Sequence, residues 1–256
     1  MMAIPVKNAA ELEAMRVSGR MTAEVLRQVA EAVRPGVTTG ELDALTRRLI
    51  GEMGAKPSFL GYRGYPGAIC ISINDEVIHG IPGSRVVQPG DVVSLDVGVY
   101  YNGFNGDSAT TVMVGVRDPD TIRLVEATRR ALAAGVAAVR PGARLSDVSH
   151  AVESVARASG CSVVRDFVGH GVGRHLHEEP QIPNYGLPGR GPVLKPGMTL
   201  AIEPMVNLGR PEVAVLDDGW TVVTRDGKPS AHFEHTVAVL EEGAEILTRS
   251  ENFQTL

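Results

Sequence analysis

A chain of 256 residues, 43% of them hydrophobic, can bury a large core in one or two domains. The formal net charge of −5 gives no overall attraction to nucleic acid, and two cysteines, Cys70 and Cys161, provide no disulfide framework. No apolar run approaches the roughly 18 residues of a membrane span, and the N-terminus lacks a secretory-signal pattern, so we expect a cytoplasmic protein.

The first half of the chain opens with two predicted helices. Each begins with a capping-box signal, a polar residue followed three residues later by glutamate, at Asn8 and again at Thr38. We expect these helices to end near Val33 and Gly54.

Strands follow the two helices. Residues 68–73 and 91–101 are rich in β-branched side chains, and the second run turns back through Asn102-Gly103, which is typical of a hairpin. Alternation puts Asp96 on the face opposite the apolar side chains of its strand. Because Asp107 is as far beyond the turn as Asp96 is before it, we expect the two to lie nearly opposite each other.

The second half repeats this order. Val33-Arg34-Pro35-Gly36 recurs as Val139-Arg140-Pro141-Gly142, in both cases before a helix-like run. The expected elements are a helix capped by Asp118-Pro119 and ending near Val139, a helix opened by Ser146 and ending at Gly160, and strands from about Met198 and Ala231. The repeat predicts an α+β protein with its helices on one side of a curved antiparallel sheet, a single catalytic domain made of two related halves, about 10–116 and 117–247.

Each half also delivers two acidic residues. A Pro-Gly pair precedes Asp96 and again Glu203 by the same spacing, and Asp107 and Glu234 follow on the next segments. The longer separation in the second half implies an inserted hairpin around residues 217–220. A lone acid within a strand would carry a heavy desolvation cost, whereas four acids that converge on cations offset it. The pattern therefore indicates a metal site.

An imidazole completes the candidate metal site. His170 lies between Gly169 and Gly171, which let the backbone approach closely and leave the ring open to a cavity. The set is rich in oxygen and has no sulfur, which favours manganese, iron, cobalt or zinc in a catalytic role over a structural zinc. The sequence does not choose among these metals.

Longer motifs carry a family resemblance. The stretches are Tyr62-Arg63-Gly64-Tyr65-Pro66, residues 70–82, Leu95-Asp96-Val97-Gly98, Gly106-Asp107, residues 169–173, His177-Glu178-Glu179-Pro180, Ile202-Glu203-Pro204 and Phe233-Glu234-His235-Thr236. Over essentially its full length the chain resembles the type I methionine aminopeptidases of the short bacterial kind. The resemblance implies the pita-bread fold with a pseudo-two-fold axis, and removal of the N-terminal methionine from nascent or newly made proteins.

The resemblance also implies roles for the site residues. Asp96, Asp107 and Glu234 would hold one divalent ion, and Asp107, His170, Glu203 and Glu234 a second. Our hypothesis is attack on the first peptide bond by a metal-activated water, with Glu203 as the proton shuttle. By analogy, His79 contacts the scissile amide nitrogen and His177 the carbonyl oxygen, and both contribute to substrate binding.

Substrate choice is expected to come from an apolar pocket. Phe59, Tyr62 and Tyr65 cluster in one loop, and Cys70, Leu176 and Trp220 match the pocket positions of the family, so together they could enclose a thioether side chain. Four residues depart from the usual family form at or near the pocket: Phe59, Arg63, Leu176 and His232.

Two other function classes remain open. One is a proline-specific aminopeptidase of the same fold, whose members generally carry a further N-terminal domain. The other is a pseudo-enzyme that binds peptide, ribosome or RNA, although such proteins typically lose metal ligands and all five are present here. For the peptidase we expect a monomer acting on peptide or protein N-termini that begin with Met, with no membrane or specific nucleic-acid partner. Contact with the ribosome near the exit tunnel stays open.

Overall fold

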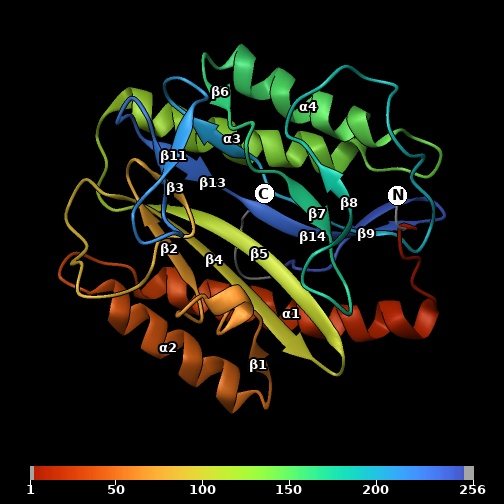
Figure 1. Ribbon diagram of the computed structural model, residues 1–256, viewed down its shortest axis with the longest axis horizontal. Helices are drawn as coiled ribbons and strands as arrows, with labels where there is room; N and C mark the ends of the chain where they lie inside the picture. Colours follow the sequence, from red (N-terminus) through yellow and green to blue (C-terminus); the bar gives the residue numbers. More distant parts are fainter. Residues whose placement is uncertain (1–2, 251–256) are drawn as a thin grey trace.

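The computed structural model describes residues 3–250, which form a curved antiparallel sheet and two helix pairs (Figure 1). The nine-stranded sheet has the order β1-β4-β5-β14-β9-β7-β8, with β2 beside β4 and β15 beside β14. Its strands are β1 (Lys56–Pro57), β2 (Cys70–Ile73), β4 (Val92–Tyr101), β5 (Phe104–Met113), β7 (Gly169–Gly171), β8 (Glu178–Ile182), β9 (Thr199–Ile202), β14 (Glu234–Leu240) and β15 (Gly243–Ile246). The predicted α+β class is confirmed.

Two small sheets accompany the large one. One contains β13 (Ser230–His232), β10 (Met205–Asn207) and β6 (Ser162–Val163), and the other β11 (Val213–Val215), β12 (Val222–Thr224) and β3 (Glu76–Ile78). The hairpin β11–β12 contains the insertion predicted around residues 217–220, and β12 pairs with β3 from the first half. The insertion therefore reaches the strand that leads directly to His79.

The first helix pair begins where the sequence predicts. The helices α1 (Ala9–Ala32) and α2 (Thr39–Glu52) each open with a complete capping box. At α1, the Glu11 N–H donates to Asn8 Oδ1 at 3.0 Å and the Asn8 N–H donates to Glu11 Oε2 at 2.9 Å. The helix starts follow from these local contacts because each box pairs donors that the first turn leaves unbonded.

The second helix pair agrees with the prediction at one start and corrects it at the other. The helix α3 (Pro119–Ala138) is capped by Asp118, as expected. The helix α4 (Leu145–Ala158) begins one residue before Ser146, and the Asp147 carboxylate accepts the Arg144 N–H at 2.9 Å. The Ser146 hydroxyl instead accepts the Arg190 N–H at 2.7 Å. Among residues 3–250, no helix is both long and apolar enough to cross a membrane.

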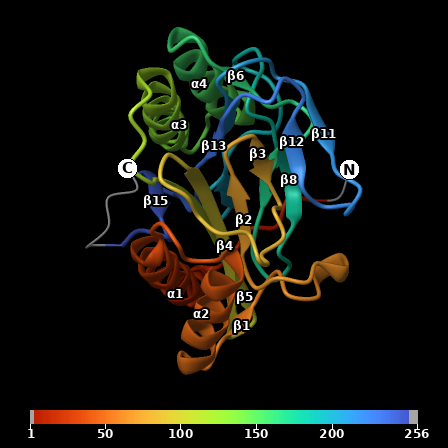
Figure 2. The same cartoon turned by 90° about the vertical axis from the view of Figure 1, so that its left-hand side faces the viewer.

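The apolar faces of the strands pack under the helices. Val93, Leu95, Val97 and Val99 of β4 join a core with α1 and α2, while Leu200 and Ile202 of β9 join a core with α3 and α4. Both helix pairs lie on the same side of the sheet, and the β11–β12 hairpin lies on the other (Figure 2). Asp96 therefore points to the face that the helices leave uncovered.

The register of the β4–β5 hairpin corrects one prediction. Asp96 lies opposite Ala109, and Asp107 lies opposite Gly98, so the two acids are diagonal neighbours rather than directly opposed. The reason is the two-residue turn Asn102-Gly103, whose positive φ angles of 47° and 87° fix Tyr101 opposite Phe104. Both carboxylates still share one face of the hairpin.

The two halves of the chain meet where β5 pairs with β14. Ala109 lies opposite both Asp96 on β4 and Glu234 on β14, so these two acids flank a small residue in one row across three strands. Two strands further along the sheet, His170 of β7 lies opposite Ala201 of β9. The sheet thus gathers acids and imidazole from both halves on its uncovered face.

Candidate active site

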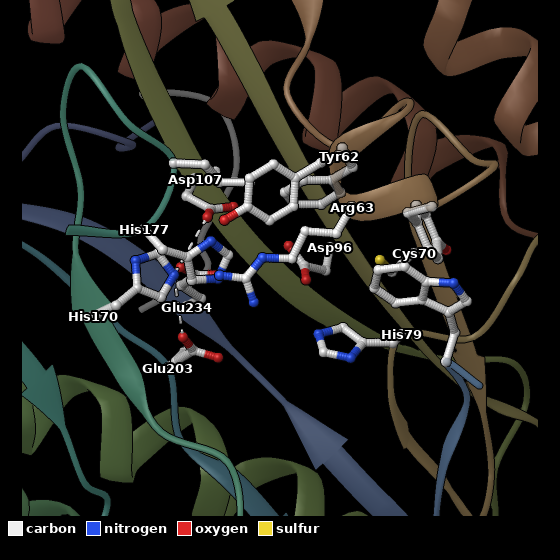
Figure 3. A pocket seen from close by; sticks show the side chains of 14 residues that line it. Tyr62, Arg63, Cys70, His79, Asp96, Asp107, His170, His177, Glu203 and Glu234 are labelled. Atoms are coloured by element: carbon white, nitrogen blue, oxygen red, sulfur yellow. Dashed lines mark ion pairs between the residues drawn. The ribbon is translucent and has the colours of Figure 1, made fainter. Parts of the chain in front are cut away.

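One cavity of about 130 Å³ collects the predicted site residues (Figure 3). All five predicted metal ligands, both predicted catalytic histidines and all six predicted pocket residues line it, together with Arg63. The lining residues are Phe59, Tyr62, Arg63, Tyr65, Cys70, His79, Asp96, Asp107, His170, Leu176, His177, Glu203, Trp220 and Glu234.

Acidic and imidazole groups crowd at one end of the cavity. Asp107, His170 and Glu234 each offer a ligand atom within 4.8 Å of the others. His170 Nε2 lies 3.7 Å from Asp107 Oδ2 and 3.5 Å from Glu203 Oε1. Among the described residues, Asp96 Oδ1, Asp107 Oδ1 and Glu234 Oε1 are buried without a hydrogen-bond partner. These oxygens are therefore available to a ligand.

Burial and mutual repulsion disfavour charge on these acids. Burial raises the pKa of Asp96 to about 7. Burial first, and the charge of Asp96 second, raise the pKa values of Asp107 and Glu203 well above their usual range. The pKa of Glu234 is raised in the same way, by burial and by the neighbouring acids. Divalent cations would relieve both costs, since an opposite charge nearby favours the ionised carboxylate.

His170 is arranged as a neutral ligand. Burial lowers its pKa to about 3, so the ring is uncharged at neutral pH. Its Nδ1 lies 2.8 Å from the Gly171 carbonyl oxygen, which can only accept, so Nδ1 carries the proton and Nε2 keeps a free lone pair. That lone pair is directed toward Asp107 and Glu203. The donor set of four carboxylates and one neutral imidazole fits divalent metal ions.

The two predicted catalytic histidines occupy different walls. His79 adopts a left-handed backbone with φ 61°, and its ring meets Phe167 and Trp220 edge-on at centroid distances of 5.9 and 6.2 Å. His177 stacks on Tyr62 at 5.3 Å, and its centroid is 4.1 Å from that of His170. Both rings border the cavity beside the acidic groups.

The other end of the cavity is apolar. Phe59, Tyr65, Cys70 and Leu176 form a buried cluster, against which Tyr62 and Trp220 pack. Tyr65 meets Trp220 edge-on at 5.1 Å, and the hydroxyl of Tyr65 donates to the Gly80 carbonyl oxygen at 2.9 Å. A single cavity thus joins a buried acidic cluster to an apolar pocket.

Three residues near the site were not assigned roles by the sequence. Arg63 lines the cavity, and His232 Nε2 is buried 3.7 Å from Glu203 Oε2 with no hydrogen-bond partner among residues 3–250. Thr236 exchanges two hydrogen bonds with the backbone of Asp107, one as donor at 2.8 Å and one as acceptor at 3.0 Å. Its place two residues after Glu234, on the same strand face, is the signal that could have indicated this role.

Comparison with known proteins decides the family. The model of metallopeptidase family M24 matches residues 13–241, a range that includes every residue lining the cavity. The chain belongs to metallopeptidase family M24. Methionine aminopeptidase 1 of Bacillus subtilis is 52% identical to this M24 chain over 243 residues, which cover 95% of the chain and 98% of that relative.

Solved structures of M24 proteins agree with the fold. The methionine aminopeptidase of Thermotoga maritima superposes with a TM-score of 0.95 at 48% identity, over 97% of this chain and 100% of the other. The prolidase of Pyrococcus furiosus matches at a TM-score of 0.77 and 24% identity, over 96% of this chain but only 66% of its own. The prolidase likeness bears on the fold alone, and together these neighbours confirm the pita-bread architecture expected for this M24 chain.

Proposed function

We propose that this M24 protein is a metal-dependent methionine aminopeptidase, which removes the first residue of proteins and peptides that begin with methionine. The observation that carries the proposal is the single cavity in which an acidic cluster adjoins an apolar pocket. The high identity to proteins named methionine aminopeptidase, over nearly the whole chain, supports it.

We propose two divalent ions per chain. Asp96, Asp107 and Glu234 would hold one, and Asp107, His170, Glu203 and Glu234 the other. The buried oxygens without partners and the free Nε2 of His170 support this assignment. When bound, such ions lower the pKa of coordinated water from 15.7 to about 7, which supplies a nucleophile at neutral pH. Cobalt, manganese, iron and zinc all suit this donor set.

The surrounding side chains handle protons and orient the substrate. Glu203 would accept a proton at Oε2, the oxygen that faces His232, and return it to the leaving amine. His79 would contact the scissile amide nitrogen, and His177 the carbonyl oxygen, where negative charge develops. Burial lowers the pKa of His79 to about 4, so this ring is neutral at neutral pH and can both donate and accept.

The apolar end would take the methionine side chain. Cys70 and Leu176 offer dispersion contacts, and the rings of Phe59, Tyr62, Tyr65 and Trp220 offer sulfur–aromatic contacts. With the side chain there, the free α-amine would reach the acidic end. Cleavage is then restricted to the first peptide bond.

The proposal extends to the setting of the reaction. Newly made chains begin with methionine in the cytoplasm, so we place the enzyme there, acting as a monomer and near the ribosomal exit tunnel. Size-exclusion chromatography with light scattering tests the monomer, and sedimentation with ribosomes tests the contact.

A peptide panel with metal-free and reconstituted enzyme tests the function. We expect release of methionine from Met-Ala-Ser after addition of manganese, cobalt, iron or zinc, and negligible activity after chelation. Preference for Ala-Pro-Ser would instead support a proline-specific aminopeptidase. Absence of hydrolysis with every metal, together with peptide binding, would support a binding protein.

A further inference from the structure

The geometry points to Arg63 as a specificity-determining residue for the substrate beyond the cleaved bond. We propose that its guanidinium attracts a carboxylate side chain at the third or fourth residue of the substrate, so that the enzyme prefers N-termini with an acid there. The inference rests on the proposed aminopeptidase function and deepens it.

Arg63 stands at the boundary between two hollows. It lines the catalytic cavity, and it also lines an adjoining groove of about 450 Å³. Only Arg63, His170 and His177 border both. The remaining walls of the groove come from the N-terminal segment and the edge of the sheet, namely Ala3, Pro5, Val168, Gly169, His175, Glu178, Glu179 and Gln181.

The groove adjoins the cavity and offers a path for the rest of the substrate. The apolar end of the cavity is closed by the buried Phe59, Tyr65 and Leu176, and the acidic end is closed by the sheet. A substrate with its first side chain in the apolar end and its amine at the acids can then continue past Arg63 and His177, which border both hollows, into the groove. At about 3.3 Å per residue, its third and fourth residues come within the span of an arginine side chain.

The charge of Arg63 is not compensated by the protein. Its side chain is exposed, and within residues 3–250 no carboxylate pairs with it and it makes no hydrogen bond. The guanidinium carbon lies 5.3 Å from the centroid of the Tyr62 ring. Figure 3 shows the guanidinium beside His177. The charge therefore remains available to a ligand.

The backbone fixes where this arginine is presented. Arg63 lies in the short helical turn η1 (Tyr62–Gly64) with φ 49°, between Gly61 and Gly64 with φ 80° and 89°. The positive φ angles produce a tight turn, which places the Arg63 side chain in the lining of the cavity. The arginine is thus held at the site by the loop and by its contact with the Tyr62 ring, and not by a carboxylate.

Two carboxylates also line the groove. Glu178 is neutralised by Lys7, at 2.5 Å from Nζ to Oε2, in a pair with little exposed surface. Glu179 is exposed. Glu179 has no ion-pair partner among residues 3–250, but it lines only the groove, whereas Arg63 borders both the groove and the cavity. The charge of Arg63 therefore favours an acid and disfavours a lysine at the substrate positions beside it.

The test compares kcat/KM for C-terminally amidated peptides of the form Met-Ala-Xaa-Ser and Met-Ala-Ser-Xaa, with Xaa as Glu, Gln or Lys. We expect Glu to exceed Lys by about twofold to fivefold in at least one series, within the range for an exposed charge pair. The ratio should fall toward one in 0.5 M salt because salt screens exposed charges.

Three substitutions test whether Arg63, and not the overall electrostatic field of the protein, sets this substrate preference. In Arg63→Gln the ratio of kcat/KM for the Glu peptide to that for the Lys peptide should approach one, and in Arg63→Glu it should invert. The control is Arg117→Gln, at an exposed arginine far along the sequence, where the ratio should keep the wild-type value. Equal rates for Glu and Lys in the wild type, or an unchanged ratio in Arg63→Gln, would overturn this inference alone. Failure of the wild type to cleave any Met-Ala peptide would overturn the proposed function and this inference with it.

Discussion

Glu203 combines the features expected of a proton-handling group. It lies directly after β9, with Oε1 at 3.5 Å from His170 Nε2 and Oε2 at 3.7 Å from His232 Nε2. Burial and the nearby charge of Asp96 raise the pKa of Glu203 well above its usual range. Bound cations would offset part of this rise, and a carboxyl whose pKa lies near neutral pH gives and takes a proton readily.

Replacement of this carboxyl tests its role. In Glu203→Gln, kcat for Met-Ala-Ser should fall by about 10²- to 10⁴-fold, the range for loss of a general acid–base group. Metal content, measured by inductively coupled plasma mass spectrometry, separates loss of the base from loss of an ion. Asp217→Asn, an exposed acid on the inserted hairpin, is the matched control and should keep wild-type kcat. A Glu203→Gln enzyme within threefold of wild type would refute the role.

At the residue scale, the sequence predicted which acids converge but not how they are spaced. Asp96 and Asp107 could be placed on one strand face because alternation along a strand is local. Their diagonal offset depends on the turn, which fixes Tyr101 opposite Phe104. The positions of Arg63 and His232 depend on loop and strand contacts made across the whole chain, so the sequence alone indicated only that they were unusual.

At the scale of elements, a buried ion pair ties the N-terminal segment to the loop that carries His177. Lys7 Nζ donates to Glu178 Oε2 at 2.5 Å, and Glu178 Oε1 accepts the His175 N–H at 3.1 Å. The two residues are 171 positions apart. Glu178 thereby connects the groove wall to the loop beside the catalytic cavity.

Breaking this pair should lower the stability of the protein. We expect Lys7→Met to lower the free energy of unfolding by about 3 kcal/mol, because it leaves a buried carboxylate without a partner. In a double-mutant cycle, Lys7→Met with Glu178→Gln should recover part of that loss, as measured by urea unfolding. Additive effects of the two substitutions would show that the pair contributes no coupling.

Helix α1 lies so close to β5 that the contact tolerates no side chain at one position. A Cβ added to Gly106 would lie 2.6 Å from Thr22 Oγ1 and 2.9 Å from Gly19 Cα. Gly106→Ala should therefore destabilise the protein by about 1 to 3 kcal/mol. The matched control is Gly51→Ala in α2, where the added Cβ meets nothing within 4 Å and should stabilise by about 0.5 to 1 kcal/mol. Thermal unfolding of both variants measures the contrast.

Elements with local signals were predictable, and short ones were not. The capping boxes at Asn8 and Thr38 and the Asp118 cap located three helix starts because their contacts span only three residues. The start of α4 was missed by one residue because the backbone of Arg144, not a Ser side chain, supplies the contact. Strand β7 has three residues, too few for an alternating pattern, and the sheet around it defines it.

At the scale of the whole molecule, the site exists only where the two parts of the sheet join. Asp96 and Asp107 come from β4 and β5, while His170 and Glu234 come from β7 and β14, and β5 pairs with β14 between them. The recurrence of the Val-Arg-Pro-Gly motif allowed this architecture to be predicted. The division into related halves, about 10–116 and 117–247, stays a prediction.

In the metal-free protein, this architecture brings acidic side chains together at a cost in folding free energy. Four largely buried acids from distant segments face one another, and burial raises the pKa of Asp96 from 3.8 to about 7. An acid whose pKa is higher in the folded state than in the unfolded state stabilises the fold less as pH rises toward the folded value. The buried histidines have the opposite pH dependence: because burial lowers their pKa values, they stabilise the fold less as the pH falls below 6.5. The contribution of Asp96 must therefore be measured by substitution.

Comparing the wild type with Asp96→Asn reports the contribution of Asp96 together with its repulsion of the other three acids, because the histidines are common to both proteins. In chelated protein, the advantage of Asp96→Asn in unfolding free energy should grow by about 1.4 kcal/mol per pH unit between pH 5 and about 7, then level off. For a chain of this length, each kcal/mol shifts Tm by about 2 to 4 °C. Saturating manganese at pH 8 should favour the wild type, since Asp96→Asn lacks one ligand of the ion that Asp96 would share with Asp107 and Glu234. A pH-independent difference between the chelated proteins, or an equal metal-induced rise in Tm for both, would contradict the idea that these acids are strained until cations bind.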